Sequence, residues 1–186
     1  KKKDGFIGTS LKKEEFAFDC SERDEIIVFR KDGKCVVTKV SDKSFVGKNI
    51  LHLAVFTRGD AECVYHLIYQ DGKAGPSYVK RFSIPSVTRD REYDLTRGTA
   101  GSKVLHFSVN PKSEGETVEV AIKPSPRKVK PVLIDFSELD VKTRSVKGNL
   151  VTKKIVNKVK VVSREKPKVE AQKIWFDSKI LAQDEF

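Results

Sequence analysis

The residues best suited to chemistry in this sequence are cations, and most of the excess lies in one part of the chain. Residues 123–173 carry 15 Lys and Arg against 5 Asp and Glu, which is +10 of the formal net charge of +11. Residues 1–122 carry a net charge of only +3, and residues 174–186 carry −2. A clustering of one sign beyond what solubility requires indicates an anionic partner.

Cations placed along polar connections can follow a line of phosphates, and the counterions that they displace supply binding free energy. Aromatic residues are sparse among these cations, which favours a duplex backbone over stacked single strands. Neighbouring glycines permit a close backbone approach. The candidate contacts for such a backbone lie in three stretches of the chain: Lys43 and Lys48; Lys80, Arg81, Arg89, Arg91, Arg97 and Lys103; and Arg127, Lys128, Lys130, Arg144, Lys147, Lys153, Lys154 and Lys158.

Catalytic and metal-binding patterns are missing from the sequence. His52 and His106 occupy the same place in two similar segments, ILHL and VLHF, which favours a structural role, and His66 is the third histidine. Three carboxylates alternate with arginines and indicate a self-neutralising loop rather than an acid–base pair: Asp90, Glu92 and Asp94 lie among Arg89 and Arg91. With no phosphate-binding loop and no metal-ligand spacing, we expect no catalytic residue, metal or cofactor in this chain.

The cysteines and the hydropathy indicate a reducing compartment without a membrane span. Cys20, Cys35 and Cys63 are irregularly spaced and form no C-x-x-C pair, so we expect small buried apolar residues rather than disulfides or zinc ligands. No apolar run approaches the roughly 18 residues that a membrane helix needs. We therefore predict a cytoplasmic protein with no membrane partner.

The elements that position the cations are predicted to be β-strands. Val and Ile together number 34, against 18 for Ala and Leu, and this excess of β-branched residues favours an all-β chain. Residues 24–40 form a predicted hairpin around Asp32-Gly33, and residues 63–82 form another around Asp71-Gly72. Residues 117–136 repeat the plan, but three prolines predict a longer connection there.

Each predicted hairpin is followed by a polar linker, a glycine and a further short strand, in segments 41–53, 86–107 and 140–161. This repeat of about 50 residues is typical of propeller-like blades, each of which buries its faces against its neighbours. The linker glycines are Gly47, Gly101 and Gly148. The residues expected between blades are Ile26, Val28, Val64, Leu67, Tyr69, Val118, Val120 and Ile122, with Arg30, Lys34 and Lys39 at wetter positions.

We divide the chain into an incoming tail of a preceding unit (1–18), three blades (19–62, 63–116 and 117–172) and a closing strand (173–186). The stretch 163–173 is short for a blade ending. The sequence contains no Met, and we expect it to be a fragment of a larger protein.

Several segments in the same order resemble the C-terminal domain of the A subunit of bacterial type IIA topoisomerases, in a Bacteroidetes-type form. They are LKKEEFAFDCSERDEIIVFRKDGKCVVTKV, GKNILHL, SYVKRF, TRGTAGSKVLHF, KGNLVTK and KIWFDSKIL. The resemblance implies an all-β fold, a β-pinwheel of four-stranded blades with exchanged strands in an open or broken ring, which binds and bends duplex DNA.

The resemblance also implies partners and cofactors that lie elsewhere. The N-terminal breakage–reunion part of the same polypeptide would carry the DNA-cleaving tyrosine, so none of Tyr65, Tyr69, Tyr78 and Tyr93 is equated with it. A topoisomerase B subunit would complete a heterotetramer. ATP and Mg would act on other domains of an enzyme that works in the cytoplasm on the nucleoid.

One departure from the family pattern concerns DNA wrapping. DNA gyrase carries a Q-R-R-G-G-K-G box in its first blade, and only degenerate pieces such as RSVKGNLVTK occur here. The absence of the box favours a topoisomerase IV type over gyrase. Two alternative functions stay open: a propeller-type scaffold that binds an acidic protein, and an RNA-binding β module.

Overall fold

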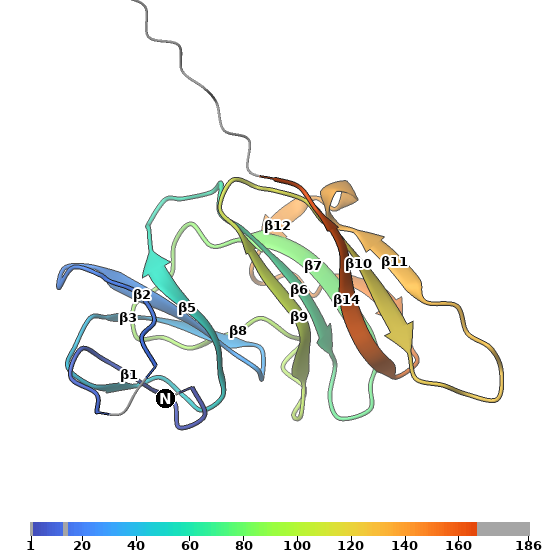
Figure 1. Ribbon diagram of the computed structural model, residues 1–186, viewed down its shortest axis with the longest axis horizontal. Coiled ribbons are helices and arrows are strands. Elements are labelled where there is room, and N and C mark those ends of the chain that lie inside the picture. The colour runs from blue at the N-terminus through green and yellow to red at the C-terminus, as the bar shows by residue number, and fades with distance from the viewer. Residues whose placement is uncertain (1, 13–14, 167–186) are drawn as a thin grey trace, which may run out of the picture.

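Residues 2–12 and 15–166 are described by a computed structural model, in which short sheets stand side by side as an open array (Figure 1). Across these residues the chain forms fourteen strands, one 3-10 helix, η1 (Phe136–Glu138), and no α-helix. The predicted all-β fold, with blades that exchange strands, is confirmed.

The first blade is the sheet β5–β2–β3–β8. Strands β2 (Glu25–Arg30) and β3 (Lys34–Lys39) form an antiparallel hairpin, and β5 (Ile50–Phe56) pairs with β2. The predicted turn at Asp32-Gly33 is confirmed, since Gly33 adopts φ = +82°, which a side chain would disfavour. The fourth strand, β8 (Tyr93–Asp94), comes from the connection that follows the next hairpin.

The second blade occupies the centre of the array and has the order β12–β7–β6–β9, with β13 also paired to β7. Its hairpin consists of β6 (Val64–Gln70) and β7 (Ser77–Ser83), and β9 (Lys103–Asn110) pairs with β6. The outer edge of β7 receives β12 (Val141–Thr143) in parallel and β13 (Asn149–Thr152) in antiparallel orientation.

The third blade contains β11 (Val132–Asp135), β10 (Glu116–Ile122) and β14 (Val156–Arg164) in that order. The connection 123–131 is long, as its prolines predicted, and extends beyond the sheet (Figure 1). The predicted closing strand at 173–186 lies outside the described residues.

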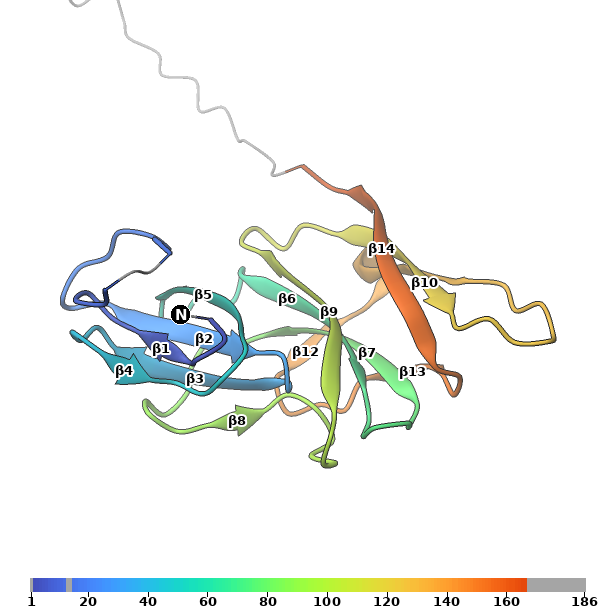
Figure 2. The ribbon, with the colours of Figure 1, turned by 60° about the horizontal axis from the view of Figure 1, so that its bottom comes forward.

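Every linker adds a strand to the unit before it. The second linker (residues 86–102) supplies β8 to the first blade, and the third linker (residues 140–148) supplies β12 to the second. The first linker (residues 41–49) follows the same rule, because its β4 (Ser44–Phe45) pairs with β1 (Phe6–Ile7) (Figure 2). Linkers therefore lie against neighbouring blades, where two units can contribute side chains to one surface.

An aromatic core fills the junction between the first two blades. The Phe29 ring of the first blade lies tilted against the rings of Tyr65 and Phe107 from the second, with centroids 4.9 and 4.6 Å away. The predicted burial of Leu67 and Tyr69 is confirmed, since both are fully buried here.

The two faces of β2 pack against different parts of the chain. Ile26 and Val28 are buried, as predicted, against Ile7 and Phe18 of the incoming tail and Leu53 of β5. Their neighbours Ile27 and Phe29 face the second blade. Because adjacent residues of a strand point to opposite faces, the first blade is covered on both sides.

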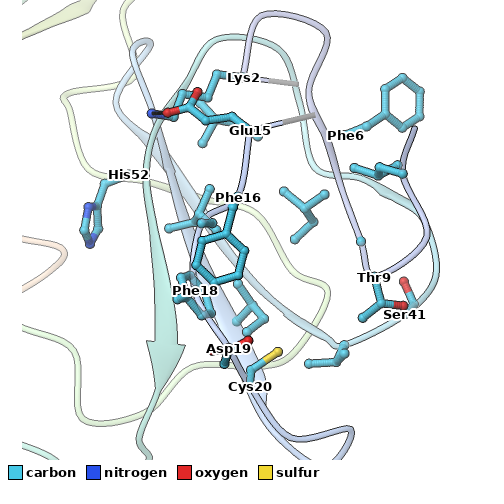
Figure 3. Close-up of a pocket in the computed structure, with 18 of the residues that line it drawn as sticks. Lys2, Phe6, Thr9, Glu15, Phe16, Phe18, Asp19, Cys20, Ser41 and His52 are labelled. Atoms are coloured by element: carbon cyan, nitrogen blue, oxygen red, sulfur yellow. Dashed lines mark hydrogen bonds and ion pairs between the residues drawn. The ribbon is translucent and has the colours of Figure 1, made fainter. Parts of the chain in front are cut away.

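The side of the first blade away from the second carries a hollow of about 900 Å³ (Figure 3). Phe16, Phe18 and Leu53 are among its apolar lining residues, and Lys2 and Glu15 form an ion pair, 3.4 Å from Nζ to Oε1. Phe16 is 76% exposed. The residues that line the hollow come from the chain up to Leu53, and these elements lie at the end of the array away from the third blade (Figure 1).

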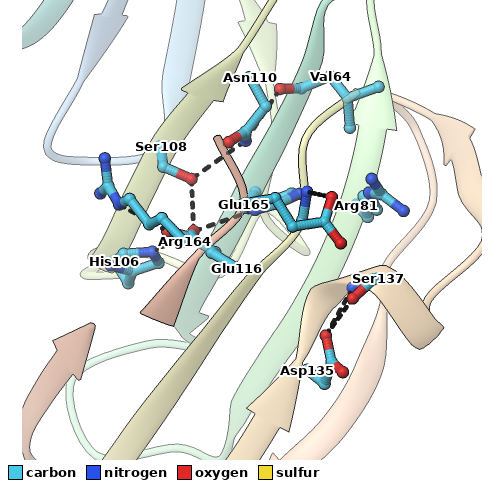
Figure 4. A network of polar contacts seen from close by, with 12 residues as sticks. Val64, Arg81, His106, Ser108, Asn110, Glu116, Asp135, Ser137, Arg164 and Glu165 are labelled. Carbon is cyan, nitrogen blue, oxygen red and sulfur yellow. Dashed lines mark hydrogen bonds and ion pairs between the residues drawn. The ribbon is translucent and has the colours of Figure 1, made fainter. Parts of the chain in front are cut away.

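The junction between the second and third blades combines an apolar core with a buried polar cluster (Figure 4). Val118 and Val120 are fully buried, as predicted, and pack with Ile68, Val79 and Phe136. Two residues before Val118 on the same face of β10, the Glu116 carboxylate is completely buried. It accepts hydrogen bonds from side chains of β6 and β9, which join the two blades: His66 Nδ1 at 3.0 Å, His106 Nε2 at 2.8 Å and Ser108 Oγ at 2.5 Å.

Candidate nucleic-acid interface

The predicted contacts of the third unit lie at the surface. Arg127, Lys128 and Lys130 occupy the projecting β10–β11 connection, and the other exposed cations lie along the third linker, the connection between β13 and β14, and β14 itself: Lys147, Lys153, Lys154 and Lys158. Among the described residues of 123–166, the ion pairs recorded involve only Arg164, which reaches Glu116. The positive field of this region is therefore not cancelled by bound carboxylates.

Sequence reasoning missed further exposed cations of the same region. They are Lys123, Lys142, Lys160, Arg164 and Lys166. Lys160 could have been found from the alternation of β14, where Val159 and Val161 turn inward and Lys158 and Lys160 turn outward. We define the basic surface as the exposed cations of residues 123–160.

Two predicted DNA contacts are corrected by the structure. Lys80 is 3% exposed and Arg81 is 8% exposed, so neither side chain is available to a phosphate. Both lie on β7, whose faces are covered by the neighbouring blades and whose edge is covered by β12 and β13. Lys80 donates to the carbonyls of Arg144 and Val146, and Arg81 donates to those of Leu139 and Ser113.

The second linker has cations that are largely paired. Arg89 lies 3.5 Å from a Glu25 oxygen, and Arg97 lies 3.9 Å from an Asp71 oxygen. Arg97 also donates to the hydroxyl of Tyr78, at 2.5 Å. Among the described residues, the predicted pairing within the loop is limited to Arg89 and Asp90, 3.9 Å apart, because the other partners come from neighbouring strands and turns.

Glu92 of the same linker turns inward toward the first blade. It accepts from Arg30 at 2.7 Å and contacts Lys34 at 3.1 Å. The Arg30 side chain is only 12% exposed, which corrects its expected wet position. Its guanidinium packs where a side chain at Gly47 would clash, so this glycine permits strand–linker packing.

Arg144 joins the second and third linkers. Its guanidinium lies 4.0 Å from the ring centroid of Tyr93, and Arg91 lies 5.2 Å from the same ring. In such cation–π contacts, the positive charge is attracted to the face of the aromatic ring. Two predicted contact residues from different units are thereby brought to one aromatic side chain.

The remaining predicted contacts are exposed. Lys43 lies over the Phe6 ring at 4.6 Å, and Lys48 follows Gly47 in the same linker. Both belong to the first blade, at the opposite end of the array from β10 and β14 (Figure 1). Lys103 begins β9.

Comparison with known proteins gives the family. The model for "Topoisomerase C-terminal domain, Bacteroidota" matches residues 1–163. The chain belongs to this family. It is also 32% identical over 158 residues to the A subunit of DNA topoisomerase 4 from Borreliella burgdorferi, covering 84% of this chain and 24% of that protein. The chain thus spans about a quarter of the length of this curated relative.

A solved structure, "Crystal structure of the C-terminal domain of DNA topoisomerase IV", matches with a TM-score of 0.46 and 14% identity, over 76% of this chain and 47% of that one. The sequence motifs predicted a resemblance to the C-terminal domains of topoisomerase A subunits. The family match and the curated relative confirm it.

The histidines of this topoisomerase domain have structural partners. His52 and His106 occupy equivalent registers, opposite Phe29 and Ile68, each of which lies three residues before an Asp-Gly turn. His66 is fully buried and stacks on Phe136 with centroids 4.1 Å apart. Sequence reasoning missed Glu116, although its even spacing with Val118 and Val120 placed it on the buried face.

The described residues offer little other chemistry. Within them, no cluster of His, Cys, Asp and Glu has the arrangement of a metal site. Burial raises the pKa of the Cys35 thiol to about 12, whereas Cys20 is exposed, contrary to the expectation of burial. A search of the same residues finds no helix with the length and hydropathy to cross a membrane.

Proposed function

We propose that this domain binds and bends duplex DNA as a noncatalytic part of a topoisomerase IV-like A subunit. The observation that carries the proposal is the basic surface, whose exposed lysines and arginines follow the β10–β11 connection, the third linker, the connection between β13 and β14, and β14. Lysines and arginines spread over connections and a strand suit the phosphate backbone, so we expect binding with little sequence preference.

In this proposal the domain captures a DNA segment for strand passage by the whole enzyme. Its partners are duplex DNA, the N-terminal breakage–reunion part and a B subunit, in the cytoplasm at the nucleoid. ATP and Mg act on those other domains, and this domain holds no cofactor. The weakly charged first blade interrupts a positive path around the rim, so the domain bends DNA without wrapping it tightly in the manner of gyrase.

A salt titration tests the proposal. With duplex DNA we expect micromolar or tighter binding at low salt, and contact with about 6–10 phosphates gives a log–log slope of roughly −5 to −9. Single-stranded DNA, RNA and an acidic protein are run in parallel. A flat salt response contradicts the electrostatic mechanism, whereas a clear preference for RNA or for the acidic protein supports the corresponding alternative function.

Matched charge variants locate the surface. Replacing Lys147, Lys153 and Lys158 by Gln is expected to reduce the magnitude of the slope by roughly 2–3, since each lost phosphate contact removes about 0.9. The control replaces Lys12, Lys31 and Lys39 by Gln, which removes the same charge from exposed positions outside the predicted contacts. Equal losses from the two triple variants would show that binding follows net charge rather than this surface.

A further inference from the structure

Two side chains of the second blade donate hydrogen bonds to the backbone of the third linker. Lys80 Nζ donates to the carbonyls of Arg144, at 2.7 Å, and Val146, at 3.0 Å. The Tyr69 hydroxyl donates to the carbonyl of Lys147, at 2.5 Å. Three carbonyls within four residues are thus turned toward the central sheet.

Both donors are rigidly placed. Lys80 is paired with Leu67 across the β6–β7 hairpin, and its ammonium lies 4.8 Å from the centroid of the Phe82 ring. Tyr69 is fully buried, and its ring stacks on Tyr78 with centroids 5.6 Å apart. Donors anchored in a packed core leave the linker backbone little freedom.

The side chains of the same linker point outward or lie on its surface. Lys147 is exposed, and Arg144 is half-buried over Tyr93. At the end of the linker, Gly148 adopts φ = +91°, and a side chain there would meet the backbone of Val79. The linker is therefore fixed to β7 along its length.

We infer that Lys80 and Tyr69 are positioning residues for DNA binding, which preorganise the segment Arg144–Lys147 by holding its carbonyls. This inference rests on the proposed function. A linker that is already ordered loses less conformational entropy when a phosphate backbone binds. The two donors therefore raise affinity without touching DNA.

The decisive experiment separates positioning from contact. Tyr69→Phe removes one donor and no charge, and Lys80→Met removes the other with little change in length. We expect each to weaken duplex binding several-fold, roughly tenfold at most, with the salt slope unchanged. The control, Lys147→Gln, should instead reduce the magnitude of the slope by about 0.9.

Hydrogen exchange provides the second measurement. In the free variants, the amides of residues 144–148 should exchange faster while those of β6 and β9 keep their protection. If Lys80→Met folds poorly, loss of protection in β6 and β9 will reveal it, and the inference is then tested with Tyr69→Phe alone.

The outcomes are distinguishable. Wild-type affinity and wild-type exchange in both variants would overturn the inference, as would a Lys80→Met slope that falls like that of Lys147→Gln. Failure of the wild-type domain to bind duplex DNA would instead overturn the proposed function.

Discussion

The two faces of the central blade each bury a charge, and they stabilise it in different ways. Toward the first blade, Lys80 is held by backbone carbonyls, with no carboxylate among its recorded hydrogen-bond or ion-pair partners in the described residues. Burial lowers its pKa to about 8. Toward the third blade, hydrogen bonds from His106, His66 and Ser108 outweigh the burial of Glu116 and hold its pKa well below the usual range.

The difference shows what a charged partner contributes inside a protein. Backbone carbonyls accept hydrogen bonds from the Lys80 ammonium, but these bonds do not fully compensate the hydration that the charge loses on burial. The neutral amine is therefore favoured, and the pKa falls. The Glu116 carboxylate has imidazole and hydroxyl donors, and the Arg164 guanidinium lies 3.3 Å from its second oxygen. The cation thus fixes a linker at a cost, whereas the anion joins two blades.

The largest effect is expected from removing that anion. Glu116→Gln leaves the shape of the site and one acceptor oxygen, but it removes the buried negative charge and places an amide NH2 group against the Arg164 guanidinium, and should cost roughly 3 kcal/mol of unfolding free energy. Denaturant titration at neutral pH measures it. Glu119→Gln, on the other face of β10, is the matched control and should stay within about 0.5 kcal/mol. Similar losses in both variants would show that the buried Glu116 cluster contributes no more to the free energy of unfolding than a carboxylate on the other face of β10.

The sequence predicted the hairpins and much of the core because these follow from local rules. Asp-Gly between β-rich runs located the turn of β2–β3, and alternation located Val118 and Val120. Alternation could not select a face for Ile26 and Ile27, because the run is apolar at every position.

Burial of Lys80 and Arg81 could not be predicted in this way. What covers them is β12 and β13, which come from about 60 residues later in the chain and pair with β7. A cation in a strand looks like a surface residue until the strand exchange is known. The exposed cations of the third unit were easier to predict, since most of them lie in connections, which run over the surface.

A smaller effect is expected from the cation, at alkaline pH. The unfolded chain holds the Lys80 proton up to its ordinary pKa of 10.5, whereas the folded protein releases it from about pH 8. Stability therefore rises with pH between these values. From pH 7 to 9.5 the wild type should gain about 2 kcal/mol relative to Lys80→Met.

The neighbours do not reverse this sign. Cys35 stays a thiol over this range because burial raises its pKa to about 12. The charges of Asp94 and Arg144 act on the Lys80 pKa in opposite directions, and each has a smaller effect than burial. Urea titrations of both proteins at the two pH values provide the measurement. A stability difference that stays constant would mean that Lys80 is not desolvated as its burial implies.

The smallest effect is expected from His66, on the anionic side of the comparison. Burial lowers its pKa below 6.5, although Glu116 acts in the opposite direction and the charges of Arg81 and His106 add to the lowering. Below pH 6.5 the unfolded chain binds this proton more readily than the folded one, so stability falls as the pH falls.

Between pH 7.5 and 5.5 the wild type should lose up to about 1 kcal/mol more than His66→Gln, whose side chain does not titrate. Chemical denaturation of both proteins at these two pH values measures the difference. A wild type that instead gains stability on acidification would show that Glu116 holds His66 as an imidazolium, and the polar cluster would then be a buried ion pair rather than a neutral hydrogen-bonded one.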